Sequence, residues 1–189
     1  MLKPDPSDPI VVTGMGVVSP LGVGVSTMWS RLTAGQSGIV QNDRFDTTGF
    51  GSSIAGLVPS KANDANGFDP IDFIDGKDIK KMDLFIQYAI GATHEALEQA
   101  NWHPTSLEDQ QATATIIGSG VGGSPVMGRA VEIIQTKGAR RLSPFTIPSF
   151  LANLAAGWLS ILHSFRGPIG TPVTACAASA QAIGDDSLQ

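Results

Sequence analysis

An apolar, β-branched run near the start of the chain is the feature that most constrains its fold. Residues 10–18 have the sequence IVVTGMGVV, with no alternation of apolar and polar positions. Such a run is typical of a strand that helices cover on both faces. Residues 112–117 (ATATII) predict a second buried strand, and residues 80–101 between them carry apolar side chains at helical spacing. This alternation predicts an α/β fold with a mostly parallel sheet.

Turn and capping residues suggest the remaining elements. Ser26 is a good N-cap for a short helix over residues 27–33. A short strand is expected at residues 54–58, inside a stretch rich in glycine, proline and aspartate. Later elements are expected to be helices at residues 127–136 and 149–162, a strand at residues 171–175, and a last helix that begins at residue 177.

Composition and charge exclude several classes of protein. The chain has 189 residues, of which 42% are hydrophobic and 15% charged, so it can bury the core of one domain or slightly more. The net charge of −5 argues against general nucleic-acid binding. The N-terminus carries no hydrophobic signal region, and the longest apolar run, residues 150–162, is too short to span a bilayer. We therefore expect a soluble cytoplasmic protein that does not bind membranes.

Basic residues gather in two places on this acidic chain. Lys77, Lys80 and Lys81 form one cluster, and Arg140 and Arg141 form the other. Two small basic clusters suit a small acidic partner better than a long polyanion. The alternative is that these side chains are ordinary solvated charges of helices and loops.

The single cysteine, Cys176, lies where the extended segment 171–175 meets a helical stretch of small residues. At the N-terminus of a helix, unpaired N–H groups and the helix dipole favour a thiolate over a thiol. The small neighbours leave room for a reactant to approach the sulfur. We therefore hypothesise that Cys176 is a nucleophile that carries an acyl group. The alternative is a small buried hydrophobic residue, which is the commonest role of a free cysteine.

The glycines at residues 118–123 (GSGVGG) match the pattern GxGxxG after a predicted strand. A dinucleotide site also needs an acidic residue at the end of the next strand, and residues 171–175 contain none. A backbone that passes close to a ligand or to a neighbouring element is the better interpretation.

Histidines and metal ligands do not form a recognisable motif with Cys176. His94, His103 and His163 have no local pattern that links them to the cysteine, so we interpret them as surface or packing residues. The sequence also lacks the spacings of zinc and calcium sites, so no metal is expected.

Six short motifs follow one another along the chain: residues 11–22 (VVTGMGVVSPLG), 83–92, 118–123, 143–148 (SPFTIP), 166–168 (RGP) and 174–176 (TAC). Together they resemble the β-ketoacyl-acyl-carrier-protein synthases, most closely the elongating synthase II type. The resemblance covers residues 10–189, and the motifs follow in the order of the family. Cys176 occupies the position of the family's nucleophile.

The resemblance implies a thiolase-like fold of αβαβα layers, of which residues 1–189 form the N-terminal half, truncated within the helix after Cys176. It implies that Cys176 accepts an acyl chain from acyl carrier protein for decarboxylative Claisen condensation with malonyl-carrier protein. The backbone N–H of Cys176 is then one oxyanion donor. No cofactor is implied beyond the phosphopantetheine that the carrier protein brings.

The resemblance also implies roles for residues around the nucleophile. Val121 is expected to line the acyl pocket, and Thr146 and Ile147 to reach the pocket of a second subunit in a homodimer. Both basic clusters fall where the family docks acyl carrier protein.

The family's catalytic histidines belong to the second half and have no counterpart in these residues. We therefore expect the 189 residues alone to be inactive in condensation and to expose an apolar face. Three alternatives are a non-catalytic scaffold or chain-length subunit, a polyketide- or nodulation-type synthase, and, on the glycine motif alone, a dinucleotide-dependent oxidoreductase.

Overall fold

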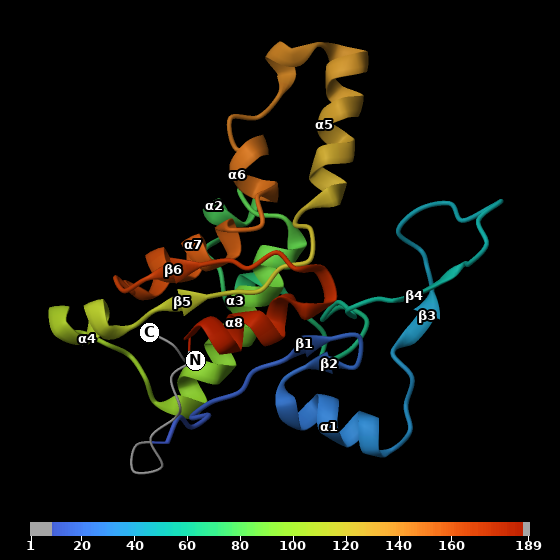
Figure 1. Ribbon diagram of the computed structural model, residues 1–189. Helices are drawn as coiled ribbons and strands as arrows, with labels where there is room; N and C mark the ends of the chain where they lie inside the picture. The colour runs from blue at the N-terminus through green and yellow to red at the C-terminus, as the bar shows by residue number, and fades with distance from the viewer. Residues whose placement is uncertain (1–8, 187–189) are drawn as a thin grey trace.

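A central helix, α3, organises the described part of the chain, residues 9–186 of the computed structural model (Figure 1). The α-helices are α1 Val25–Thr33, α2 Gly76–Ile79, α3 Leu84–Ala100, α4 Leu107–Ala112, α5 Ser124–Lys137, α6 Thr146–Phe150, α7 Leu154–His163 and α8 Ala178–Asp186. The 3-10 helices are η1 Pro70–Asp72, η2 Ala139–Arg141 and η3 Ala175–Ala177. The strands are β1 Val18–Ser19, β2 Gly22–Val23, β3 Ile39–Gln41, β4 Ile54–Gly56, β5 Thr115–Ile116 and β6 Ile169–Gly170.

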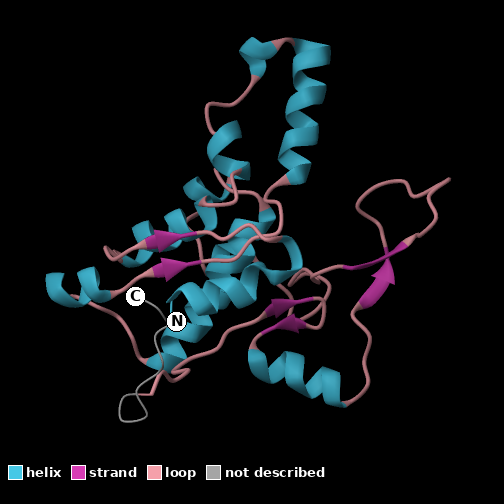
Figure 2. Ribbon diagram, in the orientation of Figure 1, coloured by secondary structure: helices cyan, strands magenta, loops and turns pink. Residues whose placement is uncertain are grey.

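The strands pair in three separate two-stranded sheets (Figure 2). β5 and β6 are parallel, with Thr115 opposite Ile169 and Ile116 opposite Gly170. The other two pairs, β1–β2 and β3–β4, are antiparallel. The predicted mixture of helix and strand is confirmed. The prediction of a mostly parallel sheet is wrong for the described residues, because two of the three strand pairs are antiparallel. Residues 20–21 are too few for a parallel crossover between β1 and β2, and residues 42–53 between β3 and β4 contain no helix to form one.

Residues 10–17 do not form the buried strand that their sequence predicts. The Met15 N–H donates to Gln99 Oε1 at 2.6 Å, and the Val17 N–H donates to Glu95 Oε2 at 2.9 Å. These N–H groups therefore bond to side chains of α3 instead of to a neighbouring strand. The side chains of residues 10–12 are 67–80% exposed, and only Val18 of the predicted strand belongs to β1.

The parallel strands β5 and β6 differ from the strands that the sequence predicts. β5 covers only two residues of the predicted strand at 112–117, and β6 lies just before the predicted strand at 171–175. The two segments nevertheless continue side by side beyond the strands. The Ile117 N–H donates to Gly170 O at 3.1 Å, and the Ser119 N–H donates to Pro172 O at 3.1 Å. This pairing brings the turn after β5 close to the segment that leads to Cys176.

Helix boundaries depend on caps that the sequence only partly indicates. Gly24, with φ of 94°, is the N-cap of α1, and Ser26 lies inside the helix, so the predicted Ser26 cap is wrong. Asp83 caps α3 by accepting from the Leu84 N–H at 2.6 Å. The single helix expected at residues 149–162 is divided into α6 and α7, because Leu151 adopts an extended conformation.

The hydrophobic core lies where α3 packs against α7. Its largest fully buried side chains are Ile86 of α3 and Leu159 of α7. Ile74, Met82, Ile90 and Ala155 complete the same cluster. This packing confirms the apolar stripe that was predicted for the long helix, and it anchors β5 and β6, both of which contact α7.

Two projections extend from this core (Figure 1). One consists of α5 and η2, which return to the core through α6. The other is the β3–β4 hairpin, where Phe45 and Phe50 meet edge to face with ring centroids 5.7 Å apart. The α5 projection contains Arg140 and Arg141, so it carries one of the two predicted basic clusters.

Candidate active site

Cys176 lies in η3, directly before α8, and its side chain is exposed. The predicted helix of small residues after the cysteine is confirmed, but the predicted strand at 171–175 is wrong: Ala175 already belongs to η3, so Cys176 lies within a 3-10 turn instead of directly after a strand. Ala178, the first residue of α8, is buried, because the backbone of Gly118 lies against it. A Cβ at position 118 would overlap the Ala178 carbonyl oxygen. The turn after β5 thus supports the base of the helix that presents the cysteine.

The backbone just before the cysteine is in an unusual conformation. Ala175 has φ of 50°, in the left-handed region that residues with a Cβ rarely occupy. Such conformations persist where the surrounding structure holds them, and they concentrate at functional sites. One side-chain hydrogen bond ties this turn to α8, and a second, within α8, orients the side chain that accepts it. Thr174 Oγ1 donates to Gln181 Oε1 at 2.9 Å, and Gln181 Nε2 donates to Asp185 Oδ2 at 3.3 Å.

The turn leaves the Cys176 N–H free of hydrogen bonds within residues 9–186. The next N–H, that of Ala177, donates to Thr174 O at 3.1 Å and closes the turn. An unused backbone N–H beside an exposed thiol is able to bind an oxygen that lies close to the sulfur. The geometry suits a nucleophile whose reacting partner carries a carbonyl group.

The three histidines lie elsewhere, in agreement with their interpretation as surface or packing residues. His94 meets Phe73 edge to face, with centroids 5.5 Å apart, and His103 Nε2 is 3.3 Å from Glu98 Oε1. His163 stacks on Phe165 at 5.3 Å. Burial, with smaller contributions from the other two histidines, lowers the pKa of His163. Within the described residues, none of the three hydrogen-bonds to Cys176.

One residue from each of the two basic clusters lines the same cavity, which has a volume of about 270 Å³. Lys80 from the segment after α2 and Arg141 from η2 both line it. Arg129 of α5 joins them, which the sequence reasoning missed because this residue is isolated from both clusters along the chain. Three cationic side chains around one hollow favour an anionic group there.

The other predicted basic residues are not all equally available. Lys77 Nζ lies 3.0 Å from Asp75 Oδ2, and this partner raises the pKa of Lys77. Lys81 Nζ lies 2.6 Å from Asp78 Oδ1 and 5.4 Å from the centre of the Phe145 ring. Arg140 is exposed in η2. Among the described residues, Lys80, Arg140 and Arg141 form no ion pair with a carboxylate, whereas Lys77 and Lys81 do.

The residues expected near an acyl chain occupy two different places. Val121 is 69% exposed in the turn before α5. Thr146 begins α6 and lines the basic cavity, whereas Ile147 beside it is 57% exposed. None of the described cavities joins these residues to Cys176, so their roles stay predictions.

The glycine-rich stretch is explained by close packing. The backbone of Gly122 and Gly123 lies against Phe150, and a Cβ at position 123 would also meet Asp83 Oδ2 at 2.5 Å. With Gly118 against Ala178, three of the glycines make close approaches to neighbouring elements. This agrees with the interpretation that the stretch passes close to a neighbouring element.

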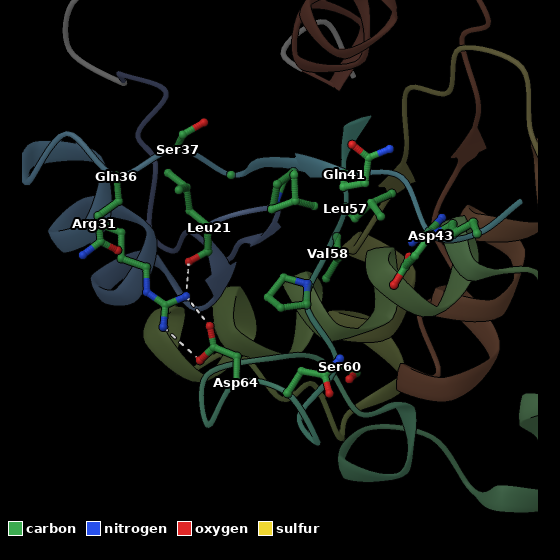
Figure 3. Close-up of a pocket in the computed structure, with 16 residues that line it drawn as sticks. Leu21, Arg31, Gln36, Ser37, Gln41, Asp43, Leu57, Val58, Ser60 and Asp64 are labelled. Atoms are coloured by element: carbon green, nitrogen blue, oxygen red, sulfur yellow. Dashed lines mark hydrogen bonds and ion pairs between the residues drawn. The ribbon is translucent and has the colours of Figure 1, made fainter. Parts of the chain in front are cut away.

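A larger cavity, of about 490 Å³, lies between α1 and the β3–β4 hairpin (Figure 3). An ion pair closes one side, with Arg31 Nη1 and Nη2 at 2.6 and 2.9 Å from the two oxygens of Asp64. Arg31 also donates to Leu21 O at 3.1 Å, so its guanidinium holds three chain segments together. No predicted site residue lines this cavity. The sequence has no signal for the pair, because its members are 33 positions apart.

Two further expectations concern metals and membranes. Among residues 9–186, no group of three or more histidine, cysteine, aspartate or glutamate side chains is arranged to hold a metal ion. The described helices include none that is both long and apolar enough to cross a membrane.

Comparison with known proteins identifies the family. The sequence model of the family described as "Beta-ketoacyl synthase, N-terminal domain" matches residues 7–187. A 3-oxoacyl-[acyl-carrier-protein] synthase 2 from Rhizobium meliloti is 43% identical over 178 residues, and one from Vibrio cholerae is 43% identical over 175 residues. These matches cover 94% and 93% of this chain but 42% and 40% of the relatives, so the chain spans about two fifths of their length. The chain belongs to the β-ketoacyl synthase family.

Solved structures agree on the fold. The ishigamide ketosynthase/chain length factor matches with a TM-score of 0.74 and 27% identity, covering 93% of this chain and 44% of that chain. A ketosynthase in complex with a type II PKS acyl-carrier protein matches with a TM-score of 0.69 and 23% identity, covering 93% and 44%. The fold is the thiolase-like fold of ketosynthases, as the sequence resemblance implied.

Proposed function

We propose that this chain supplies the acyl-accepting nucleophile of a 3-oxoacyl-acyl-carrier-protein synthase. The observation that carries the proposal is the position of Cys176: an exposed thiol at the opening of α8, with an unused N–H and a left-handed residue before it. Membership in the β-ketoacyl synthase family supports it, because the curated relatives are named for this activity.

In the proposed reaction the Cys176 thiolate attacks the thioester carbonyl of an acyl carrier protein. The acyl group moves to the sulfur, and the carrier's thiol leaves. Malonyl-carrier protein then loses CO₂, and the resulting carbanion attacks the acyl-cysteine carbonyl. A C–C bond forms, the C–S bond breaks, and the Cys176 thiolate is released. The product is a 3-oxoacyl carrier protein, two carbons longer.

The Cys176 N–H serves as one oxyanion donor in both additions. Negative charge develops on the carbonyl oxygen beside the sulfur, where this N–H is not used by the fold. A donor of this kind contributes roughly 2.7–4 kcal/mol to transition-state stabilisation in other acyl-transfer enzymes.

Acyl carrier protein is the proposed partner, docked by the basic residues. The cavity lined by Lys80, Arg129 and Arg141 supports this, since it gathers cations from α5, η2 and the segment after α2. Arg140 beside it adds exposed positive charge, whereas Lys77 and Lys81 contribute less because their own aspartates partly neutralise them.

We further propose a homodimer in which Thr146 and Ile147 reach a second subunit and Val121 lines the acyl pocket. Phosphopantetheine enters only on the carrier protein, and the cytoplasm is the proposed compartment.

Residues 1–189 alone are proposed to accept an acyl group but not to complete condensation. The described histidines have other partners: His94 and His163 contact aromatic rings, and His103 lies beside a glutamate. Decarboxylation of malonyl-carrier protein therefore has no evident catalyst within residues 9–186.

Acylation of Cys176 tests the proposal directly. The protein is incubated with an acyl carrier protein that bears a radiolabelled acyl group, and the labelled residue is located by peptide mass spectrometry. We expect label on Cys176, and we expect Cys176→Ala to abolish it, a loss of at least about 100-fold because no other thiol is present. Equal labelling of both proteins would overturn the proposal.

Turnover of labelled malonyl-carrier protein by the isolated 189 residues would refute the proposed inactivity of this polypeptide.

A non-catalytic scaffold or chain-length subunit is the second candidate. The match to the ishigamide ketosynthase/chain length factor favours keeping this candidate, because the name of that structure includes a chain length factor. The exposure of Cys176 favours the enzyme, because a scaffold needs no accessible thiol. Iodoacetamide labelling at neutral pH separates the two. Rapid modification of Cys176 supports the enzyme, and an inert thiol supports the scaffold.

A further inference from the structure

The side chains of Thr174, Gln181 and Asp185 form a hydrogen-bonded chain that spans the cysteine turn. Thr174 precedes the turn, and Gln181 and Asp185 lie one and two turns further along α8. The bond from Thr174 Oγ1 to Gln181 Oε1 is 2.9 Å, and that from Gln181 Nε2 to Asp185 Oδ2 is 3.3 Å. The amide of Gln181 therefore accepts from one partner and donates to the other, and its orientation is determined by both.

These side-chain hydrogen bonds span a backbone segment whose conformation is unfavourable in isolation. Ala175, with φ of 50°, lies between Thr174 and Cys176. A residue with a Cβ in this region needs contacts on either side to keep it there. Two backbone bonds contribute: the Ala177 N–H donates to Thr174 O at 3.1 Å, and the Ala178 N–H donates to Ala175 O. The side-chain bond from Thr174 to Gln181 is a third contact.

We propose that Gln181 is a positioning residue that holds the Thr174–Ala175 segment so that the Cys176 thiol and N–H stay aligned for acyl transfer. The proposal rests on the proposed function of Cys176. Gln181 acts through Thr174, and no contact of Gln181 with the reacting atoms is required. A small loss of alignment at a nucleophile lowers its rate without weakening the binding of its substrate.

Four variants of the intact protein test the hydrogen-bonded chain. Gln181→Ala removes both bonds, and Gln181→Glu keeps an acceptor for Thr174 but sets a second carboxylate against Asp185. Asp185→Asn alone keeps an acceptor for Gln181, and the double variant Gln181→Glu with Asp185→Asn restores a donor and acceptor at every link. Gln135→Ala is the matched control, because this exposed glutamine of α5 makes no side-chain hydrogen bond within the described residues.

The first readout is the rate of Cys176 acylation by acyl carrier protein. We expect Gln181→Ala and Gln181→Glu to lower the maximal rate roughly 3- to 10-fold with KM unchanged. Asp185→Asn, the double variant and Gln135→Ala are expected to stay within about twofold of the wild type. A Gln181→Ala protein as fast as the wild type, or a double variant no faster than Gln181→Glu, would overturn the proposal.

The second readout is hydrogen exchange of the Ala177 amide, followed by NMR, which does not depend on activity. We expect faster exchange in Gln181→Ala, because the turn closed by the Ala177–Thr174 bond loosens, and recovery in the double variant. Unchanged exchange would show that Gln181 does not hold the turn. If the wild type itself is not acylated, the proposed function fails. The hydrogen-exchange result still decides whether the hydrogen bonds of Gln181 hold the turn.

Discussion

At the scale of single residues, the Arg31–Asp64 pair shows how much a long-range contact changes one side chain. Asp64 accepts from both terminal nitrogens of Arg31 and also from the Asn66 N–H at 2.9 Å. The Arg31 hydrogen bond, followed by that from Asn66, lowers the pKa of Asp64 from 3.8 to about 2. The pair joins α1 to the segment after β4, so its ionisation affects the assembly of the cavity wall in Figure 3.

The lowered pKa predicts an acid-dependent loss of stability. A carboxyl group whose pKa is lower in the folded protein stabilises the fold above its unfolded pKa, and this contribution is lost as the pH falls through the folded value. We expect the urea midpoint to fall between about pH 4 and pH 2, and the fall to be smaller in Asp64→Asn. Asp43→Asn, an exposed aspartate that lines the same cavity, is the control. Identical profiles for Asp64→Asn and the wild type would contradict this account.

At the scale of elements, the segment of residues 13–17 and helix α3 form one unit in which the segment pairs with no strand. The backbone N–H groups of Met15 and Val17 bond to Gln99 and Glu95 of the helix. Glu95 also accepts from the Val25 N–H at 2.8 Å, so one carboxylate connects α1, α3 and the N-terminal segment. Gly14 and Gly16 make this approach possible, because a Cβ at either would overlap a carbonyl oxygen of α3.

This close approach makes Gly16 sensitive to the smallest substitution. In Gly16→Ala the added methyl group meets the Ala92 carbonyl oxygen of α3, which is backbone and cannot turn away. We expect a loss of about 1–3 kcal/mol in the free energy of unfolding, measured with urea. Gly51→Ala is the matched control, since nothing lies within 4 Å of the added atom, and we expect a change within about 0.5 kcal/mol. Equal stability of the two variants would show that the segment does not pack against α3 as described.

At the scale of the whole molecule, many large apolar side chains lie on the surface of the described residues. Side chains that are more than 65% exposed include Ile10, Val11, Val12, Phe50, Val121, Ile161 and Ile183. Surfaces of this kind mark contacts with other protein surfaces or cause aggregation. These side chains come from several separate elements, so the single exposed apolar face that the sequence led us to expect stays a prediction.

We expect the isolated 189-residue polypeptide to self-associate as its concentration rises. Burial of exposed apolar surface drives the association, at about 25 cal/mol for each Å² removed from water. Sedimentation velocity over a range of concentrations measures it, and Val12→Lys is expected to shift the distribution towards the monomer because Val12 is 80% exposed. A clean monomer at high concentration would contradict the prediction.

By itself the sequence determined the features that local spacing encodes. The long amphipathic helix and the helix of small residues after Cys176 follow from side-chain periodicity and residue size. The family resemblance also needed only the order of short motifs. Tertiary structure decided what depends on partners distant in the chain. Residues 10–17 bond to α3 instead of forming a strand, Arg129 joins the basic cavity, and Gln181 reaches back to Thr174. These outcomes depend on contacts between groups that are distant in the sequence, and local sequence patterns do not encode such contacts.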